Sequence, residues 1–391
     1  MITVSIVNVT SYTGQELLRL LAQHPRFVLT SVTGRSAAGK RLGEVFPQSG
    51  IATPASFDNA SNLVITEEPE QTDLAFVCLP HAAAAESVVT LLERGIKVVD
   101  LSADFRLRDA ALYAEWYKHT HPAPALLENA VYGLCERYRE QIAGASLVAN
   151  PGCYATAAIL AMLPAVSTSI IAPDLIIDAK SGISGAGRSP TLSTHYAEAN
   201  EDVSAYSLTG HRHLAEITQE LEAAARTDNP HYSDKNQKMT DQHVYSRGGS
   251  EGGRSKGDEG GRPGVDCPLR ITFIPHLIPM TRGILATCYA DLKQDESGQV
   301  PTTEQVRSLY AEYYGDEPFV QVVDQPPHTK WTYGNNACLV YPMVDTRTRR
   351  LLVISCLDNL VKGAAGQAIQ NANRLYGLPE TTGLSALALY P

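Results

Sequence analysis

The sequence lacks the patterns that mark several common classes of protein. Its seven cysteines are widely spaced and none forms a C-x-x-C pair, which argues against a disulfide framework or a zinc site. No apolar run reaches the length of a membrane span, and the N-terminus has no basic or apolar region of a signal peptide. The net charge of −10 argues against nucleic acid as a partner. These absences predict a cytoplasmic protein that needs no metal, membrane or nucleic acid.

The first part of the chain alternates strand-like and helix-like segments. Helical spacing of leucines begins at residue 16, and a second helix is expected over residues 82–94. The expected strands cover residues 2–9, 27–32, 74–79 and 97–101. This alternation is typical of an α/β fold with a Rossmann-like, doubly wound parallel sheet, which binds ligands beyond the carboxyl ends of its strands. We therefore predict a dinucleotide-binding domain over residues 1–150.

After residue 150 the strands follow one another, and one clear helix, 303–314, interrupts them. The expected strands cover residues 175–179, 271–274, 283–292, 319–323, 337–344 and 351–356. Consecutive strands favour a mainly antiparallel sheet, so residues 151–356 are predicted to form a second, α+β domain. A final helix over 361–376, within the C-terminal segment 357–391, is expected to rejoin the first domain.

Residues 227–266 differ in composition from the rest of the second domain. They are rich in Gly, Ser and charged residues. Such a segment cannot bury enough apolar surface to offset the entropy lost on ordering. We predict a disordered surface insertion, and composition alone leaves a functional tail as the alternative.

The clearest candidate for chemistry is Cys153. It follows the turn Asn150-Pro151-Gly152 and precedes a helical pattern over residues 155–163. A thiol at a helix start is close to unpaired backbone N–H groups and to the positive end of the helix dipole, and both favour the nucleophilic thiolate. The alternative is a buried core cysteine, but a core thiol needs no such turn in front of it.

The turn after the first strand lies where a dinucleotide-binding sheet has its Gly-rich loop. The three glycine positions of that loop carry Asn8, Ser11 and Gly14, so a plain strand–helix crossover remains compatible with this turn. After the second strand, Arg35 and Ser36 stand where NAD-binding proteins have a carboxylate. These side chains suit a 2′-phosphate, which indicates NADP rather than NAD; a solvated basic loop is the alternative.

Three further segments carry polar groups suited to catalysis or anion binding. Backbone N–H groups of the glycine-rich loop 181–188 are suited to bind phosphate or cofactor, although a merely flexible loop fits as well. His211-Arg212-His213 combines two acid–base groups with an anion-binding guanidinium. Arg106 follows a strand end, where it faces either the ligand crevice or an ion pair with Asp104.

With these motifs, the chain resembles the N-acetyl-gamma-glutamyl-phosphate reductase family over nearly its whole length outside 227–266. Residues 150–156, Asn-Pro-Gly-Cys-Tyr-Ala-Thr, are similar to the family's active-site signature. The supporting segments are 101–107, 181–188, 211–213, 275–283 and 358–367.

The resemblance implies an NADP-dependent acyl-phosphate reductase of arginine biosynthesis. It would convert N-acetyl-gamma-glutamyl phosphate to N-acetyl-glutamate 5-semialdehyde and phosphate through a thioester on Cys153. It also implies that His211 or His213 is the acid–base partner, with a slight preference for His213, and that the second domain forms a homodimer or homotetramer. The implied NADP(H) contacts are Asn8, Ser11, Tyr12, Thr13, Gly14, Arg35, Ser36, Ser181, Gly182 and Asn359. The implied substrate contacts are Arg106, Asn150, Arg188 and Arg212.

Departures from the family pattern leave alternatives open. Ser11 stands where glycine is usual, and a positive φ there would cost about 1–2 kcal/mol. A cofactor-deficient regulatory homologue is therefore one alternative. The others use the same chemistry on N-acetyl-aminoadipyl phosphate, in lysine biosynthesis, or on aspartyl phosphate, since spacing does not reveal pocket shape.

Overall fold

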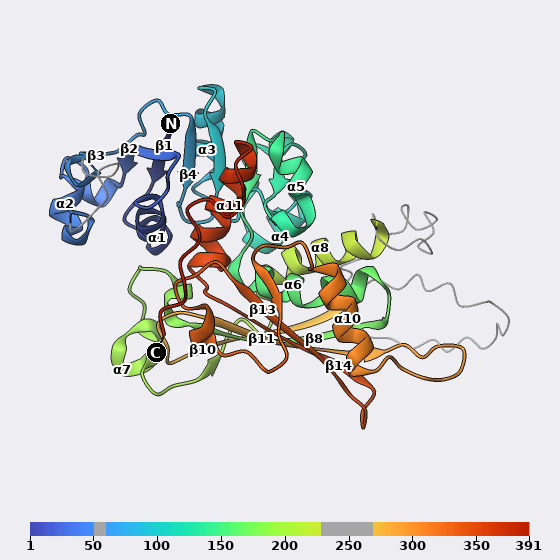
Figure 1. The fold of residues 1–391 in the computed structure, drawn as a ribbon. Coiled ribbons are helices and arrows are strands. Elements are labelled where there is room, and N and C mark those ends of the chain that lie inside the picture. The colour runs from blue at the N-terminus through green and yellow to red at the C-terminus, as the bar shows by residue number, and fades with distance from the viewer. Residues whose placement is uncertain (51–59, 228–268, 391) are drawn as a thin grey trace, which may run out of the picture.

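The computed structural model describes residues 1–50, 60–227 and 269–390, which form two sheets with their helices (Figure 1). Apart from Thr227, the predicted insertion 227–266 lies outside the described residues. None of the described helices combines the length and apolar character needed to cross a bilayer.

The first sheet has seven described strands in the order β3-β2-β1-β4-β5-β7-β6, and all of their pairings are parallel. The strands are β1 Ile2–Val7, β2 Phe27–Thr33, β3 Ile65–Thr66, β4 Leu74–Val77, β5 Lys97–Asp100, β6 Val131–Tyr132 and β7 Leu147–Ala149. The helices here are α1 Tyr12–Leu21, α2 Leu42–Val45, α3 Ala85–Glu93, α4 Ala110–Tyr117 and α5 Cys135–Ala143. The predicted Rossmann-like sheet is confirmed. Its strand order reverses between β1 and β4, so a ligand crevice is expected at their carboxyl ends.

The second sheet has the order β12-β13-β14-β11-β8-β10-β9 within the described residues. Its strands are β8 Ile171–Gly182, β9 Ser204–Ala205, β10 Arg270–Ile278, β11 Ile284–Leu292, β12 Val320–Val322, β13 Cys338–Asp345 and β14 Arg350–Leu357. The pairs β8–β10 and β12–β13 are parallel, and the other neighbours are antiparallel. The prediction of a mainly antiparallel sheet is confirmed.

Helices cover one face of the second sheet. They are α6 Cys153–Ser167, α8 His213–Thr227 and α10 Thr303–Tyr313, whereas the short α7 Tyr196–Ala199 lies near its edge (Figure 1). Every side chain of α6 from Tyr154 to Ser167 is buried, which explains its run of small and apolar residues. On the opposite face, outward side chains such as Ile176, Tyr289 and Ile354 are half-exposed or exposed.

The C-terminal segment returns to the first sheet, and its helical residues cover nearly the expected range, with a change of helix type at the start. A π-helical turn, Val361–Ala365, precedes α11 Gly366–Leu375, and no helix follows within the described residues up to 390. α11 lies beside the first sheet (Figure 1), and its apolar side chains share one core with those of β1 and β2. On the π-helical turn, the wholly buried Lys362 Nζ pairs with Glu136 Oε1 of α5 at 2.5 Å. Charge pairing therefore accompanies apolar packing where the last helix meets the first domain.

Candidate active site

Cys153 is the first residue of α6, directly after the turn that leaves β7. Among the six described cysteines it alone is half-buried, whereas the others are buried. The π-helical turn packs against it, because a β-carbon at Gly363 would lie 2.7 Å from the β-carbon of Cys153. The structure therefore presents this thiol at the junction of both sheets.

Gly152, the residue before the thiol, is enclosed by two functional side chains. A β-carbon at this position would lie 2.5 Å from His213 Nε2 and 2.8 Å from Arg106 Nη1. Contacts below 3.0 Å cannot be accommodated without movement, so glycine is required here. Arg106 and His213 therefore both lie against the reactive turn.

Glu216 of α8 holds this turn, and sequence reasoning missed it. Its Oε1 accepts hydrogen bonds from the Gly152 N–H at 2.8 Å and from the Tyr132 hydroxyl at 2.6 Å. Its Oε2 lies 3.5 Å from Arg106 Nη1, and both side chains are almost wholly buried. The available signal was a carboxylate one helical turn after His213, on the side of α8 that faces the turn.

The alternative of an ion pair between Arg106 and Asp104 is wrong. Arg106 Nε donates to the Asn150 carbonyl at 2.8 Å, and Nη2 donates to the Leu101 carbonyl at 3.0 Å. Asp104 instead accepts hydrogen bonds from the backbone N–H groups of Ala82, Ala84 and Ala85 at the start of α3. The Asn150 side chain also bonds within the protein, to the Ala364 carbonyl and the Asn371 amide. Asn150 therefore positions the turn, and its side chain is not directed to a substrate.

The resting thiol is protonated, contrary to the sequence expectation of a favoured thiolate. Burial raises the pKa of Cys153 to about 11, although the Arg106 guanidinium and the backbone N–H of Tyr154 act in the opposite direction. The helix start does favour the anion, as expected. The cost of removing water from the charged sulfur is larger, and the π-helical turn at Gly363 is one of the segments packed against it.

The two histidines of the His-Arg-His motif differ in position. His213 has Nε2 against Gly152, and its Nδ1 has no hydrogen-bond partner in the described part of the chain. His211 accepts the His213 backbone N–H at Nδ1 and packs edge-on against the rings of Tyr154 and Tyr206. Burial lowers the pKa of both rings, to about 4 for His211. Both are neutral near pH 7, and His213 is the better placed to accept a proton from the thiol.

The first turn adopts the geometry of a dinucleotide loop, with the positive φ at Asn8 and not at Ser11. Asn8 has φ +70°, whereas Ser11 has φ −73°, so Ser11 does not carry the backbone strain of a positive φ. Asparagine tolerates the left-handed region, and the Asn8 amide donates to the Cys78 carbonyl at 2.9 Å. A β-carbon at Gly14 would lie 2.6 Å from the Asn8 carbonyl oxygen, which is the close helix–strand contact that requires the third glycine.

The start of α1 is suited to an anion. Ser11 Oγ caps the helix by accepting the Gly14 N–H at 3.0 Å. The N–H groups of Tyr12 and Thr13 have no acceptor among the described residues. Unpaired N–H groups at a helix N-terminus bind phosphate. Arg35 and Ser36 are exposed beyond β2, next to this turn, since a β-carbon at Gly34 would touch the Thr10 side chain.

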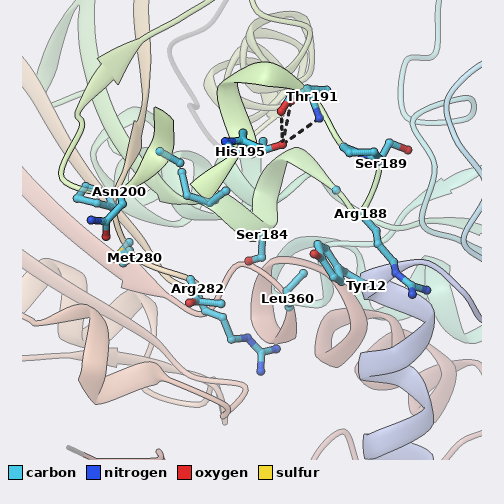
Figure 2. A pocket seen from close by; sticks show the side chains of 17 residues that line it. Tyr12, Ser184, Arg188, Ser189, Thr191, His195, Asn200, Met280, Arg282 and Leu360 are labelled. Atoms are coloured by element: carbon cyan, nitrogen blue, oxygen red, sulfur yellow. Dashed lines mark hydrogen bonds between the residues drawn. The ribbon is translucent and has the colours of Figure 1, made fainter. Parts of the chain in front are cut away.

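The glycine loop of the second domain lies opposite this turn. Figure 2 shows Tyr12 of α1, Ser184, Arg188 and Leu360 around a pocket of about 590 Å³. Arg188 Nη1 donates to the Thr10 carbonyl at 2.8 Å, so this side chain lies on the first-turn side and not beside Cys153. The predicted substrate contact of Arg188 thus lacks support from its position.

Buried side chains fix the shape of this loop. Ser181 is buried, and a β-carbon at Gly182 would lie 2.8 Å from the Arg282 backbone nitrogen. Asn359 accepts the Gly283 N–H at 2.7 Å and donates to the Ser184 hydroxyl at 2.9 Å. These contacts hold the loop in the position where it faces α1. Among the described side chains, no group of three or more His, Cys, Asp or Glu is arranged to hold a metal ion.

Two family models match the chain. The semialdehyde dehydrogenase NAD binding domain matches residues 3–145. The semialdehyde dehydrogenase dimerisation domain matches residues 153–236 and 265–359. Both the first sheet and the second therefore fall within one known family.

Curated relatives match over almost the full length. A protein of Dehalococcoides mccartyi (strain CBDB1) named N-acetyl-gamma-glutamyl-phosphate reductase is 50% identical over 387 residues, which cover 99% of this chain and 98% of the relative. A protein of Heliobacterium modesticaldum with the same name is 44% identical over 394 residues, covering 100% of both chains.

Solved structures share the fold at low identity. Aspartate semialdehyde dehydrogenase II from Vibrio cholerae has a TM-score of 0.63 at 14% identity, covering 96% of this chain and 99% of that one. Aspartate semialdehyde dehydrogenase with NADP from Candida albicans has a TM-score of 0.62 at 16% identity, covering 96% and 98%.

The raised thiol pKa predicts how Cys153 reacts with alkylating agents. Since the thiolate is the reactive form and the pKa is about 11, the alkylation rate should rise about tenfold per pH unit between pH 7 and pH 10. Iodoacetamide labelling followed by peptide mass spectrometry measures this rate. A rate that is already constant above pH 8 would show that the thiolate forms at rest.

Proposed function

The chain belongs to the semialdehyde dehydrogenase family, in the branch of the N-acetyl-gamma-glutamyl-phosphate reductases, and on this basis we propose its reaction and its catalytic residues. It reduces N-acetyl-gamma-glutamyl phosphate with NADPH to N-acetyl-glutamate 5-semialdehyde and phosphate. This reaction belongs to arginine biosynthesis. The observation that carries the proposal is the constellation of Cys153, His213, Arg106 and Glu216 around one glycine turn.

Cys153 is the nucleophile and His213 is its proton acceptor. Because both groups are neutral near pH 7, proton transfer to His213 accompanies attack of the sulfur on the acyl carbon. Phosphate leaves, and the acyl group remains as a thioester. The N–H of Tyr154 and the charge of Arg106 stabilise the sulfur as its negative charge develops. After reduction, the alkoxide collapses to the aldehyde as its carbon–sulfur bond breaks, and protonated His213 returns its proton to the departing sulfur of Cys153.

The first turn and the glycine loop fit a nicotinamide cofactor. The free N–H groups of Tyr12 and Thr13 suit its pyrophosphate, and Gly14 permits the close helix–strand contact of such sites. Arg35 and Ser36 suit the 2′-phosphate of NADP. Ser181, Gly182 and Asn359 shape the loop that faces this turn. When bound, NADPH supplies the hydride that reduces the thioester.

The reverse reaction tests this function directly. With N-acetyl-glutamate 5-semialdehyde, phosphate and NADP, the wild-type protein should form NADPH only when phosphate is present. Cys153→Ser should lose at least about 1,000-fold in rate, because serine is a far weaker nucleophile without its own activation, while its NADPH affinity stays unchanged.

Each failure of this assay has a distinct meaning. Turnover only with the N-acetyl-aminoadipyl analogue would move the proposal to the lysine pathway. Absence of NADPH binding would support a regulatory homologue. A Cys153→Ser variant as fast as the wild type would contradict the thioester mechanism.

Glu216 acts by positioning the reactive turn. Glu216→Gln keeps an oxygen for the Gly152 N–H but removes the charge that compensates Arg106. We expect kcat to fall about 100-fold, because misplacement of a reacting group by about 1 Å has effects of that size. Glu222→Gln, further along α8, is the matched control and should keep its activity. Equal kcat values for both variants would contradict this role.

The face of the second sheet that no described helix covers supports a homodimer. Its family model is a dimerisation domain, and Ile176 on this face is 43% exposed. Ile176→Glu should shift the sedimenting species toward the single-chain mass, whereas Val64→Glu, at an exposed site outside this face, should not. A wild-type protein that sediments as one chain would contradict the dimer. Since the chemistry needs Cys153 as a reduced thiol, a reducing cytoplasm is its expected compartment.

A further inference from the structure

His81 follows β4, and sequence reasoning did not single it out. It lies at the carboxyl end of a strand next to β1, where the sheet reverses its order. The next residue, Ala82, has φ +62°, an uncommon conformation for alanine. The Asp104 carboxylate accepts the Ala82 N–H at 2.8 Å and so holds this turn. The fold therefore presents the His81 side chain in a fixed position.

His81 and Arg212 meet on one aromatic ring. The rings of His81 and Tyr117 have centroids 5.9 Å apart in edge contact, and Arg212 Cζ lies 5.5 Å from the Tyr117 centroid. In the part of the chain that the structure describes, neither His81 nor Arg212 makes a hydrogen bond or an ion pair. Both side chains are exposed to solvent. They are therefore available to a ligand.

This pair adjoins the catalytic group. Arg212 lies between His211 and His213 in the sequence, the rings of these two histidines have centroids 4.7 Å apart, and His213 Nε2 lies against Gly152. The charge of Arg106 is compensated by Glu216, whereas that of Arg212 is not. The Arg212 guanidinium has no carboxylate partner among the described residues, and the His81 ring has no hydrogen bond there. Together, near the turn that carries Cys153, they suit a dianion.

On the basis of the proposed function, we propose that His81 and Arg212 form the subsite for the phosphoryl group of the acyl phosphate, with Tyr117 as their platform. The phosphoryl group is bonded to the carbon that Cys153 attacks, so its site must adjoin the nucleophile. In the reverse direction, the same subsite takes inorganic phosphate. Partial loss of water around the ring, together with the charges of Arg106 and Arg212, lowers the pKa of His81 to about 4, so the neutral ring donates one N–H to the phosphate.

The test compares Michaelis constants in the reverse reaction. His81→Gln and Arg212→Gln should each raise the KM for phosphate at least about tenfold, as expected for loss of one charge-assisted or neutral hydrogen bond to an anion. The KM values for the semialdehyde and NADP should stay within about twofold. Arg212→Lys should recover part of the phosphate affinity, since it keeps the charge but loses the planar fork. The controls are His119→Gln, at an exposed histidine, and Arg226→Gln on α8.

A second measurement does not depend on turnover. Inorganic phosphate should slow iodoacetamide labelling of Cys153 in the wild type, and this protection should be lost in the His81→Gln/Arg212→Gln double variant. Protection without any phosphate-dependent turnover would mean that the subsite exists and the proposed reaction is wrong. A raised KM for the semialdehyde with an unchanged KM for phosphate would assign the pair to a substrate carboxylate and overturn the proposal. Unchanged protection in the double variant would overturn it as well.

Discussion

One buried carboxylate joins the parts of the molecule that make the reactive turn. Glu216 comes from α8 of the second domain, yet it accepts hydrogen bonds from Gly152 and from Tyr132 at the end of the first sheet. It also balances Arg106, which in turn holds the carbonyl groups of Asn150 and Leu101. A buried charge is tolerated only when it is paired and hydrogen-bonded. The position of the nucleophile is thus tied to a charge network that neither domain completes alone.

Burial also decides the resting protonation state of the reactive groups. The same loss of water that raises the pKa of Cys153 lowers the pKa values of His211 and His213. A neutral thiol beside a neutral imidazole is less prone to oxidation than a thiolate–imidazolium pair. The thiol therefore loses its proton to His213 only with substrate in place, because the new bond to the acyl carbon then takes up the negative charge of the sulfur.

The sequence predicted correctly those parts of the structure that depend on residues close together in the chain. The turn before Cys153, the contact at Gly14 and the two sheet types follow from residue type and spacing. The sequence left open whether Ser11 takes a positive φ, because glycine is usual there, but the residue with the positive φ is Asn8, whose amide donates to the Cys78 carbonyl just after β4. That partner lies 70 residues away and leaves no local pattern.

The residues that were missed depend on tertiary contacts. Glu216 is one glutamate among several on an ordinary amphipathic helix, and its contacts with Gly152, Tyr132 and Arg106 set it apart. His81 was accessible in principle, since it follows a strand whose carboxyl end borders the crevice. The thiolate expectation was wrong because a helix start is a local feature, whereas the burial that overrides it depends on segments distant in the sequence, such as the π-helical turn at Gly363.

The placement of α11 has a consequence for how the chain folds as it leaves the ribosome. This helix completes the core around β1 and β2, yet the whole second domain precedes it in the sequence. The nascent first sheet therefore remains open on one side until synthesis has passed residue 375. Domains commonly fold in order of their appearance, but here the earlier domain must finish last. Until α11 has been synthesised, the apolar surface that it covers stays exposed, and we expect chaperones to bind it there.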